Sequence, residues 1–385
     1  MLLRVARTIL ILFLASVVWG HAQSQPFETK APYAFLIEAE TGTVLFSKSA
    51  DEPFPPASLA KLMTIELVFQ ALKEGRLSPH EMFFVSEYAW RTGGAVSGTS
   101  TMFAEVSSSV PLEALLQGVI VQSANDGAIA IAEGLAGSEE RFAQRMTDRA
   151  RQLGMETSTF VNSTGLPAEG QHVTAREMTM LALHLWREYP EYYHYFAEPG
   201  FEWNGIFQRN RNPLLAVDIG ADGLKTGHTE ASGYAIVASA ERDGRRLFAT
   251  LSGLSSGSER IEETRKLLDW GMRGFERKNV LESEEIVGEA RVFGGNKRTI
   301  GLRTTRPLSV FVPVDESAKL SGRIVYQGPL TAPIEEGVEI GKLQIRFGDQ
   351  VSQETVLYAA ESVEKGTLHQ RALDAAGELL IGWIR

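Results

Sequence analysis

The amino-acid sequence predicts an α/β protein: a layered domain, then a small all-β module, then a helical tail. Three patterns indicate this architecture. Strand-like runs enclose apolar helical segments up to about residue 275, short runs broken by Gly and Pro fill 287–346, and a helical period returns at 366–385. A chain of 385 residues has room for two or three domains of about 150 residues each.

The elements of the layered domain follow along the chain. Strand-like runs at 33–37 and 44–46 flank a Glu-Thr-Gly turn and predict a hairpin. Two later runs, at 234–240 and 247–252, flank an Arg-Asp-Gly turn, and a helix over 260–275 closes the domain. Because strands stand at both ends with helices between them, we expect one sheet covered by helices. The expected intervening helices cover 58–72, 112–121, 128–136 and 142–153.

The composition excludes several classes of protein. The formal net charge is -10, and a phosphate-binding surface needs clustered Lys and Arg, so we expect no nucleic-acid partner. The absence of cysteine excludes disulfides, thiol catalysis and cysteine-based metal sites. The seven histidines form no H-x-x-x-H or H-x-x-E-H pair, so we expect no metal site.

The first 22 residues have the pattern of an export signal. Arg4 and Arg7 form a basic start, an apolar run follows at 8–19, and Gly20-His21-Ala22 resembles a cleavage site. The run is too short to span a bilayer easily, and an uncleaved N-terminal anchor is the alternative. An exported chain without cysteine suits a bacterial envelope.

The first of three short motifs is Ser58-Leu59-Ala60-Lys61, at the start of a predicted helix. Serine needs a base to become a nucleophile, and residues three apart share a helix face, so Lys61 can reach the Ser58 oxygen. Burial and a neighbouring cation would lower the pKa of Lys61, as a base requires. Alone, such a serine is more often a helix N-cap. A second S-x-x-K, at 362–365, is interpreted as a chance match.

The second motif is Ser123-Ala124-Asn125, directly after a predicted apolar helix. The Ser123 hydroxyl can relay a proton between base and leaving group, and Asn125 can hold both Lys61 and a substrate amide. The alternative interpretation of this motif is structural. It is a helix C-cap followed by an Asn-Asp turn.

The third motif is Lys225-Thr226-Gly227-His228, expected on an edge strand. Lys225 offers a positive charge, the Thr226 hydroxyl can bind a carboxylate, and Gly227 lets a substrate approach the backbone. A backbone N–H just after Gly227 can pair with that of Ser58 as an oxyanion hole. The alternative is a surface turn.

Together and in this order, the motifs resemble those of the D-alanyl-D-alanine carboxypeptidases among the low-molecular-mass penicillin-binding proteins, of the penicillin-binding protein 5 and 6 type. The resemblance covers about 33–275 and continues more weakly through the β module. The segments that carry it are Pro56 to Thr64, Gln122 to Asp126, Ser163 to Leu166, Gly170 to Met178, and Asp222 to Thr229 with Gly233-Tyr234.

The resemblance implies a penicillin-binding/β-lactamase-like transpeptidase fold, an antiparallel sheet with helices on both faces. It also implies a reaction. Ser58 attacks the penultimate D-alanine of a peptidoglycan stem pentapeptide, the terminal D-alanine leaves, and water hydrolyses the acyl-enzyme. β-Lactam antibiotics acylate the same serine. The implied role is in cell wall biogenesis and cell shape, with no cofactor.

The resemblance also assigns the substrate contacts. Backbone N–H groups of Ser58 and His228 would form the oxyanion hole. Thr226 would bind the terminal carboxylate of the substrate, helped by Arg211 and Arg260. A carboxypeptidase needs such a positive site because it acts only at a free chain end.

Two departures from the family pattern keep alternatives open. Ala124 stands where many relatives have glycine, and no E-x-x-L-N motif lies in 160–174. A deacylating glutamate of the β-lactamase type is therefore not evident, and we interpret Glu169 as a solvated loop residue. The alternatives are a DD-endopeptidase, a β-lactamase, and a non-catalytic envelope scaffold.

The expected division of the chain is a signal peptide at 1–22, a peptidase domain at 23–278, an all-β domain at 279–365 and an amphipathic helix at 366–385. In the tail, apolar residues fall on one helical face and charged residues on the other. Such a helix lies in a membrane interface rather than across it. We therefore expect a peripheral protein on the periplasmic face of the inner membrane. The alternative is a helix that caps the β module.

Overall fold

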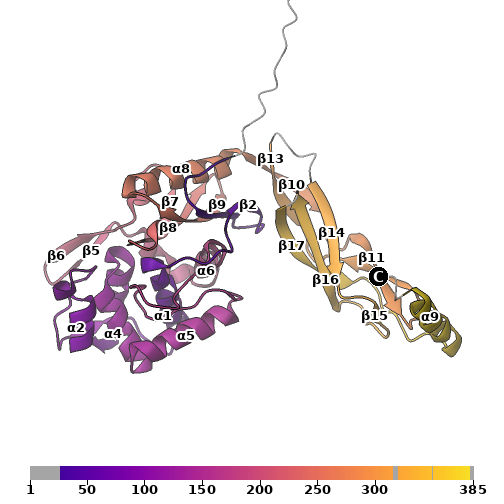
Figure 1. Cartoon of the computed structure of the whole chain (residues 1–385), viewed down its shortest axis with the longest axis horizontal. Coiled ribbons are helices and arrows are strands. Elements are labelled where there is room, and N and C mark those ends of the chain that lie inside the picture. The colour runs from indigo at the N-terminus through magenta and orange to yellow at the C-terminus, as the bar shows by residue number, and fades with distance from the viewer. Residues whose placement is uncertain (1–26, 315–319, 349, 382–385) are drawn as a thin grey trace, which may run out of the picture.

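The computed structural model describes residues 27–314, 320–348 and 350–381, so the expected export signal at 1–22 lies outside the described residues. Figure 1 shows a layered body that carries the helices α1 to α8, and an elongated β region that ends in α9. The strands β10 and β13 lie where the two parts meet.

A five-stranded antiparallel sheet forms the centre of the layered body, with the strand order β2-β1-β9-β8-β7. Both predicted strand pairs are confirmed, and the third motif lies on an edge strand as predicted. The strands are β1 (Tyr33–Glu38), β2 (Val44–Lys48), β7 (Ala221–Thr229), β8 (Gly233–Arg242) and β9 (Arg245–Leu254).

Helices cover both faces of this sheet, as predicted. Side chains alternate along β1, so Phe35 and Ile37 enter the core shared with α1 (Lys61–Lys73), while Ala34 and Leu36 enter the core shared with α8 (Gly257–Arg273). The sequence analysis did not predict α6 (Ala175–Glu188), which packs on the α1 side. Its start carries a sequence signal, because the Thr174 side chain accepts from the Glu177 N–H.

Two predicted helices contain irregular turns at the site. The predicted helix over 58–72 begins with a 3-10 turn, η1 (Ala57–Ala60), before α1. The predicted helix over 112–121 ends in a π-helical turn, η3 (Gly118–Gln122), after α3 (Leu112–Gln117). Turns of both kinds often occur at functional sites because they redirect the next side chain.

The remaining elements complete the layered body. The helices predicted at 128–136 and 142–153 correspond to α4 (Asn125–Ala136) and α5 (Glu139–Gln152). The short elements are β3 (Met82–Phe84), α2 (Glu87–Gly93), η2 (Ala95–Ser97), β4 (Ser109–Pro111), α7 (Pro190–Tyr193), η4 (His194–Ala197), β5 (Gly200–Trp203), β6 (Ile206–Arg209) and η5 (Pro213–Ala216).

An all-β region follows, as predicted, with its own apolar core. The predicted closing helix is two residues too long, because α8 ends at Arg273 and Phe275 already begins β10. A two-stranded sheet pairs β10 (Phe275–Leu281) with β13 (Leu308–Pro313). A six-stranded sheet has the order β14 (Leu320–Tyr326), β16 (Glu339–Phe347), β17 (Gln350–Ala359), β12 (Thr299–Arg303), β11 (Ile286–Phe293) and β15 (Leu330–Thr331).

A last helix, α9 (Leu368–Ile381), falls within the range expected for the tail. Thr367 and Gln370 cap its start reciprocally, since the Thr367 N–H donates to Gln370 Oε1 and the Gln370 N–H to Thr367 Oγ1. Leu368 is 80% exposed. Over the described ranges, no helix is both long enough and apolar enough to cross a bilayer.

Candidate active site

The 3-10 turn η1 brings the first motif together. Residues three apart eclipse each other in a 3-10 turn, which places Lys61 directly over Ser58. Nζ of Lys61 donates to Oγ of Ser58 at 3.0 Å. The residue before the serine, Ala57, has a φ of 46°, a conformation that costs energy for a residue with a side chain. Gly165 packs against this turn so closely that a Cβ on it would lie 1.7 Å from the Ala57 carbonyl oxygen.

Lys61 has the environment of a base rather than of a surface ammonium group. Its side chain is fully buried, and Nζ also donates to the Thr164 carbonyl at 2.5 Å. Burial lowers the pKa of Lys61 to about 7; Glu139 opposes this shift and Arg211 adds to it. Lys61 is therefore far more easily deprotonated than an exposed lysine, and a neutral amine can accept the Ser58 proton.

The second motif lies across the cleft from the first. Ser123 has a φ of 63° and caps the end of η3, and it also lines the cleft. Its Oγ is buried without a hydrogen-bond partner, as is Oδ1 of Asn125. Nδ2 of Asn125 donates to Thr99 Oγ1 at 2.9 Å. In the described part of the chain no hydrogen bond joins Asn125 to Lys61, whose second acceptor is the Thr164 carbonyl instead.

The third motif approaches the first along β7. A Cβ on Gly227 would lie 3.1 Å from the Ala57 Cβ and 3.3 Å from the Ser58 nitrogen, so glycine permits this approach. Lys225 is buried, and Nζ donates to the Thr226 carbonyl at 3.2 Å. Burial and then the charge of Lys61 lower the pKa of Lys225 well below its usual value. These surroundings oppose the positive charge expected of Lys225, whose role in the site stays a prediction.

Two arginines line the same cleft, as expected. Arg211 follows β6, and its Nε donates to Gln122 Oε1 at 3.1 Å. Arg260, in the first turns of α8, is half-buried, and its guanidinium lies 5.6 Å from the centre of the Tyr234 ring. The His228 ring also packs against Tyr234, with 4.0 Å between the two ring centres. Burial lowers the pKa of Arg260.

One cleft of about 680 Å³ thus gathers most of the predicted site residues. Its wall includes Ser58, Ser123, Asn125, Arg211, Thr226, Gly227, His228 and Arg260, while Lys61 and Lys225 lie buried beneath it. No carboxylate is among the described residues that line it. Glu169 is exposed and lines a neighbouring pocket, as its interpretation as a loop residue requires.

Sequence reasoning missed several residues of the site. Thr99, Ser100 and Tyr234 also line the cleft, and Glu139 stands behind Lys61. The sequence did not mark Glu139 as a site residue, because acidic residues directly after an N-cap serine such as Ser138 are common in the first turn of a helix.

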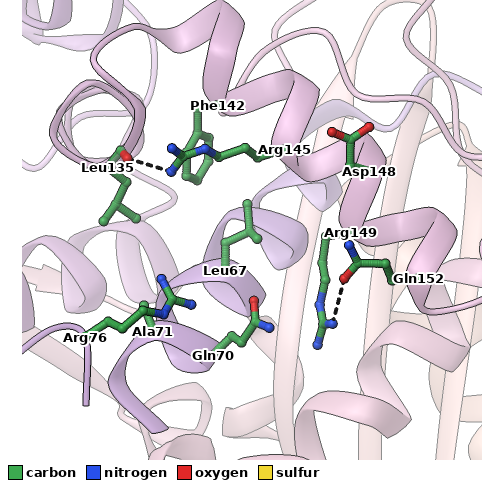
Figure 2. A pocket seen from close by; sticks show the side chains of 10 residues that line it. All are labelled: Leu67, Gln70, Ala71, Arg76, Leu135, Phe142, Arg145, Asp148, Arg149 and Gln152. Carbon is green, nitrogen blue, oxygen red and sulfur yellow. Dashed lines mark hydrogen bonds between the residues drawn. The ribbon is translucent and has the colours of Figure 1, made fainter. Parts of the chain in front are cut away.

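A second pocket, of about 330 Å³, lies between α1, α4 and α5 and contains none of the predicted site residues. Figure 2 shows Arg145 directed at the Leu135 carbonyl, to which it donates at 2.6 Å, and Arg149 directed at Gln152. Arg149 also donates to the buried Glu66 at 2.8 Å. These arginines stabilise helix ends and a buried carboxylate, so we do not place the active site here.

The fold and the cleft define a serine peptidase of the penicillin-binding type, and the comparisons with known proteins agree. A family profile described as D-alanyl-D-alanine carboxypeptidase matches residues 20–254, and one described as penicillin-binding protein 5, C-terminal domain, matches 275–365. The chain therefore belongs to the D-alanyl-D-alanine carboxypeptidase family. The predicted family, fold class and enzyme class are confirmed.

Three similar proteins illustrate the relationship. D-alanyl-D-alanine carboxypeptidase DacD of Escherichia coli K12 is 35% identical over 353 residues, covering 91% of each chain. Penicillin-binding protein 5 from Haemophilus influenzae aligns with a TM-score of 0.73 and 32% identity over 88% of this chain and 99% of that one. Penicillin-binding protein D2 from Listeria monocytogenes, solved with ampicillin bound, aligns with a TM-score of 0.56 and 29% identity over 64% of this chain and 100% of that one.

Proposed function

We propose that this D-alanyl-D-alanine carboxypeptidase uses Ser58 as its nucleophile and Lys61 as the base, and that its substrate is the stem pentapeptide of peptidoglycan. One observation carries the assignment: a fully buried lysine whose Nζ lies 3.0 Å from the serine oxygen and whose pKa is lowered to about 7. A base with a pKa near the working pH transfers protons most effectively.

The reaction follows from the positions of these groups. Neutral Lys61 takes the proton of Ser58 as Oγ attacks the carbonyl carbon of the penultimate D-alanine. The backbone N–H groups of Ser58 and His228 stabilise the oxyanion. The unpartnered Oγ of Ser123 gives its own proton to the departing amine of the terminal D-alanine and takes the Ser58 proton from protonated Lys61 in exchange, so that Lys61 is neutral again. Because the described cleft wall has no carboxylate, Lys61 also activates the water that hydrolyses the acyl-enzyme.

The cleft's positive charge supports specificity for a free chain end. Arg211 and Arg260 lie in one cleft with the Thr226 hydroxyl, and a carboxylate bound to guanidinium groups is held by strong, charge-assisted hydrogen bonds. The same contacts would receive the carboxylate of a β-lactam, so we propose that penicillins acylate Ser58.

The experiment that tests this specificity compares two substrates that differ at one atom. A pentapeptide ending in D-Ala-D-Ala should be hydrolysed, and its C-terminal amide should react at least tenfold more slowly. Arg211→Gln and Arg260→Gln should each reduce the rate on the acid and leave the rate on the amide unchanged. Equal rates on acid and amide in the unmodified enzyme would contradict the carboxypeptidase assignment and favour an endopeptidase.

The rest of the expected organisation also stays a proposal. We place the export signal at 1–22, the peptidase domain at 23–278, the all-β domain at 279–365 and a membrane-surface helix at 366–385, which includes α9. The solvent-exposed Leu368 at the start of α9 and the apolar face in the sequence support an interfacial helix. The enzyme would then act on peptidoglycan from the periplasmic face of the inner membrane.

A further inference from the structure

A buried carboxylate that belongs to none of the three motifs lies behind the reactive lysine. Glu139, the first residue of α5, is 6% exposed. Its Oε1 accepts from the backbone N–H of Ser163 at 3.0 Å and from Ser163 Oγ at 2.6 Å. Its Oε2 accepts from the Tyr88 hydroxyl at 2.8 Å. The carboxylate is thus fully engaged and fixed from two sides.

Ser163, which donates to Glu139, directly precedes the residue whose carbonyl accepts from Lys61. Ser163 precedes Thr164, whose carbonyl accepts from Lys61 Nζ at 2.5 Å. The Ser163 carbonyl in turn accepts from Thr64 Oγ1 on α1 at 2.8 Å. The loop is therefore fixed between α5 and α1, and the Thr164 carbonyl orients Nζ toward Ser58.

Glu139 also contributes charge. The charged groups that act on Lys61 come from four elements or loops. Glu139 on α5 and Asp126 on α4 favour its protonated form, and Arg211 after β6 opposes it, as does Lys225 on β7 when it is protonated. Asp126 is committed elsewhere, because its carboxylate accepts from the Thr101 hydroxyl and from backbone N–H groups. Among these groups, Glu139 alone combines a negative charge with a hold on the loop that contacts Lys61.

We propose that Glu139 is a positioning residue for the catalytic lysine: it holds the Thr164 carbonyl against Lys61 Nζ and supplies the negative charge that balances the cations of the cleft. This inference rests on the proposed role of Lys61 as the base. It extends the catalytic arrangement to a side chain that does not touch the substrate.

Glu139→Gln separates the two contributions. Glutamine keeps an acceptor for Ser163 but removes the charge, so the pKa of Lys61 should fall and a larger fraction of Lys61 should be neutral at low pH. In the full chain, the second-order rate of acylation by fluorescent penicillin is measured from pH 5 to 9. We expect the midpoint of its rise to move down by about 0.5–1 pH unit, with the plateau within about threefold of the unmodified enzyme.

Two further variants complete the test. Ser163→Ala keeps the charge and removes one hydrogen bond, so it should lower the plateau at least tenfold without moving the midpoint. Glu140→Gln is the matched control, because it removes the same charge from the exposed neighbouring position on α5. It should change neither quantity. The charged neighbours that act on Lys225 are Lys61, Arg211 and Arg260, so a shift caused by Glu139→Gln reports on Lys61.

The outcomes are distinct. A midpoint for Glu139→Gln that equals that of Glu140→Gln, or that moves upward, would overturn the proposal. A fall in melting temperature that accounts for the rate loss in both Glu139→Gln and Ser163→Ala would reduce Glu139 to a structural residue and overturn it as well. Continued labelling of Ser58→Ala would instead contradict the proposed function, which this variant tests separately.

Discussion

The pattern S-x-x-K occurs in both parts of the molecule, and the two occurrences have opposite environments. In the layered body, Lys61 is fully buried and contacts Ser58. In the β region, Ser362 and Lys365 are both exposed, and Ser362 Oγ accepts from the backbone N–H of Glu336 at 3.0 Å. The geometry of the first pair allows proton transfer, whereas the serine of the second pair only accepts a hydrogen bond from the backbone. The four-residue pattern is the same, so the difference comes from the turn that leads into α1 and from the burial of Lys61.

The buried charges of the two regions differ in the same way. The described part of the β region buries polar side chains only at Thr304 and Ser352, and none of them is charged. The layered body buries seven charged side chains. They are Glu38, Lys61, Glu66, Asp126, Glu139, Lys225 and Glu263. Burial of a charge is costly unless the charge is paired or shifts its pKa. Glu38, Glu66 and Glu263 accept hydrogen bonds away from the cleft, whereas Asp126, Glu139 and Lys225 all act on the charge of Lys61.

The largest expected effect comes from removing the proposed nucleophile, with the serine of the second S-x-x-K pattern as the control. Ser58→Ala should abolish labelling by fluorescent penicillin, because no other serine in the described chain has a buried amine within hydrogen-bond reach. Ser362→Ala should leave labelling unchanged. Mass mapping of the labelled peptide should identify the segment that contains Ser58. Labelling of Ser58→Ala at the unmodified rate would show that the nucleophile is wrongly assigned.

Removal of the lysine from each of the two patterns should change the acylation rate to very different extents. Lys61→Ala removes the general base and should slow acylation about 10²–10⁴-fold. Lys365→Ala should have no effect on the rate. Stopped-flow or gel-based labelling measures both variants, and circular dichroism checks that each one is folded. A Lys61→Ala enzyme that retains most of its rate would show that another group takes the serine proton.

The pH dependence of acylation by the unmodified enzyme tests whether Lys61 has the pKa of a buried or of an exposed lysine. Burial lowers the pKa of Lys61 to about 7, and the neutral form is the base. The acylation rate should therefore rise with pH through a midpoint near 7 and fall about tenfold for each pH unit below it. Labelling rates from pH 5 to 9 measure this curve. A rate that continues to rise up to pH 10 would mean that Lys61 has the pKa of an exposed lysine.

The smallest effect on catalysis should come from the end of the β region. Deletion of 366–385 should leave the hydrolysis of a soluble pentapeptide unchanged, because the cleft residues lie between Ser58 and Arg260. The deletion should release the enzyme from membranes. High salt should not, because the charges of the tail cancel and binding rests on buried apolar area.

Fractionation of the full-length and truncated proteins, with and without salt, measures both effects. Loss of soluble-peptide activity on truncation would show that α9 supports the fold instead. Release of the full-length protein by salt alone would show that its attachment is electrostatic.

The sequence by itself determined the class of the fold, the central strands and the three motifs. Strand alternation and helical spacing are local patterns, and the motif residues are distinctive in type and order. It also placed Arg211 and Arg260 in the cleft, through the resemblance to the family. It did not identify α6, although Thr174 and Glu177 carry a capping signal, and it placed the end of α8 two residues too late.

The tertiary structure alone decided which ionisable groups are chemically active. Nothing near Glu139 in the sequence distinguishes it from the solvent-exposed Glu140. The residues around Lys61 favoured its S-x-x-K pattern over the one at 362–365, but only the folded chain shows that Lys61 is buried. The pKa of Lys61 depends on its burial and on the charges of Glu139 and Arg211, and its orientation depends on the carbonyl of Thr164, more than a hundred residues away. Desolvation and long-range contacts arise only when the chain is folded, so they cannot be predicted from local sequence patterns.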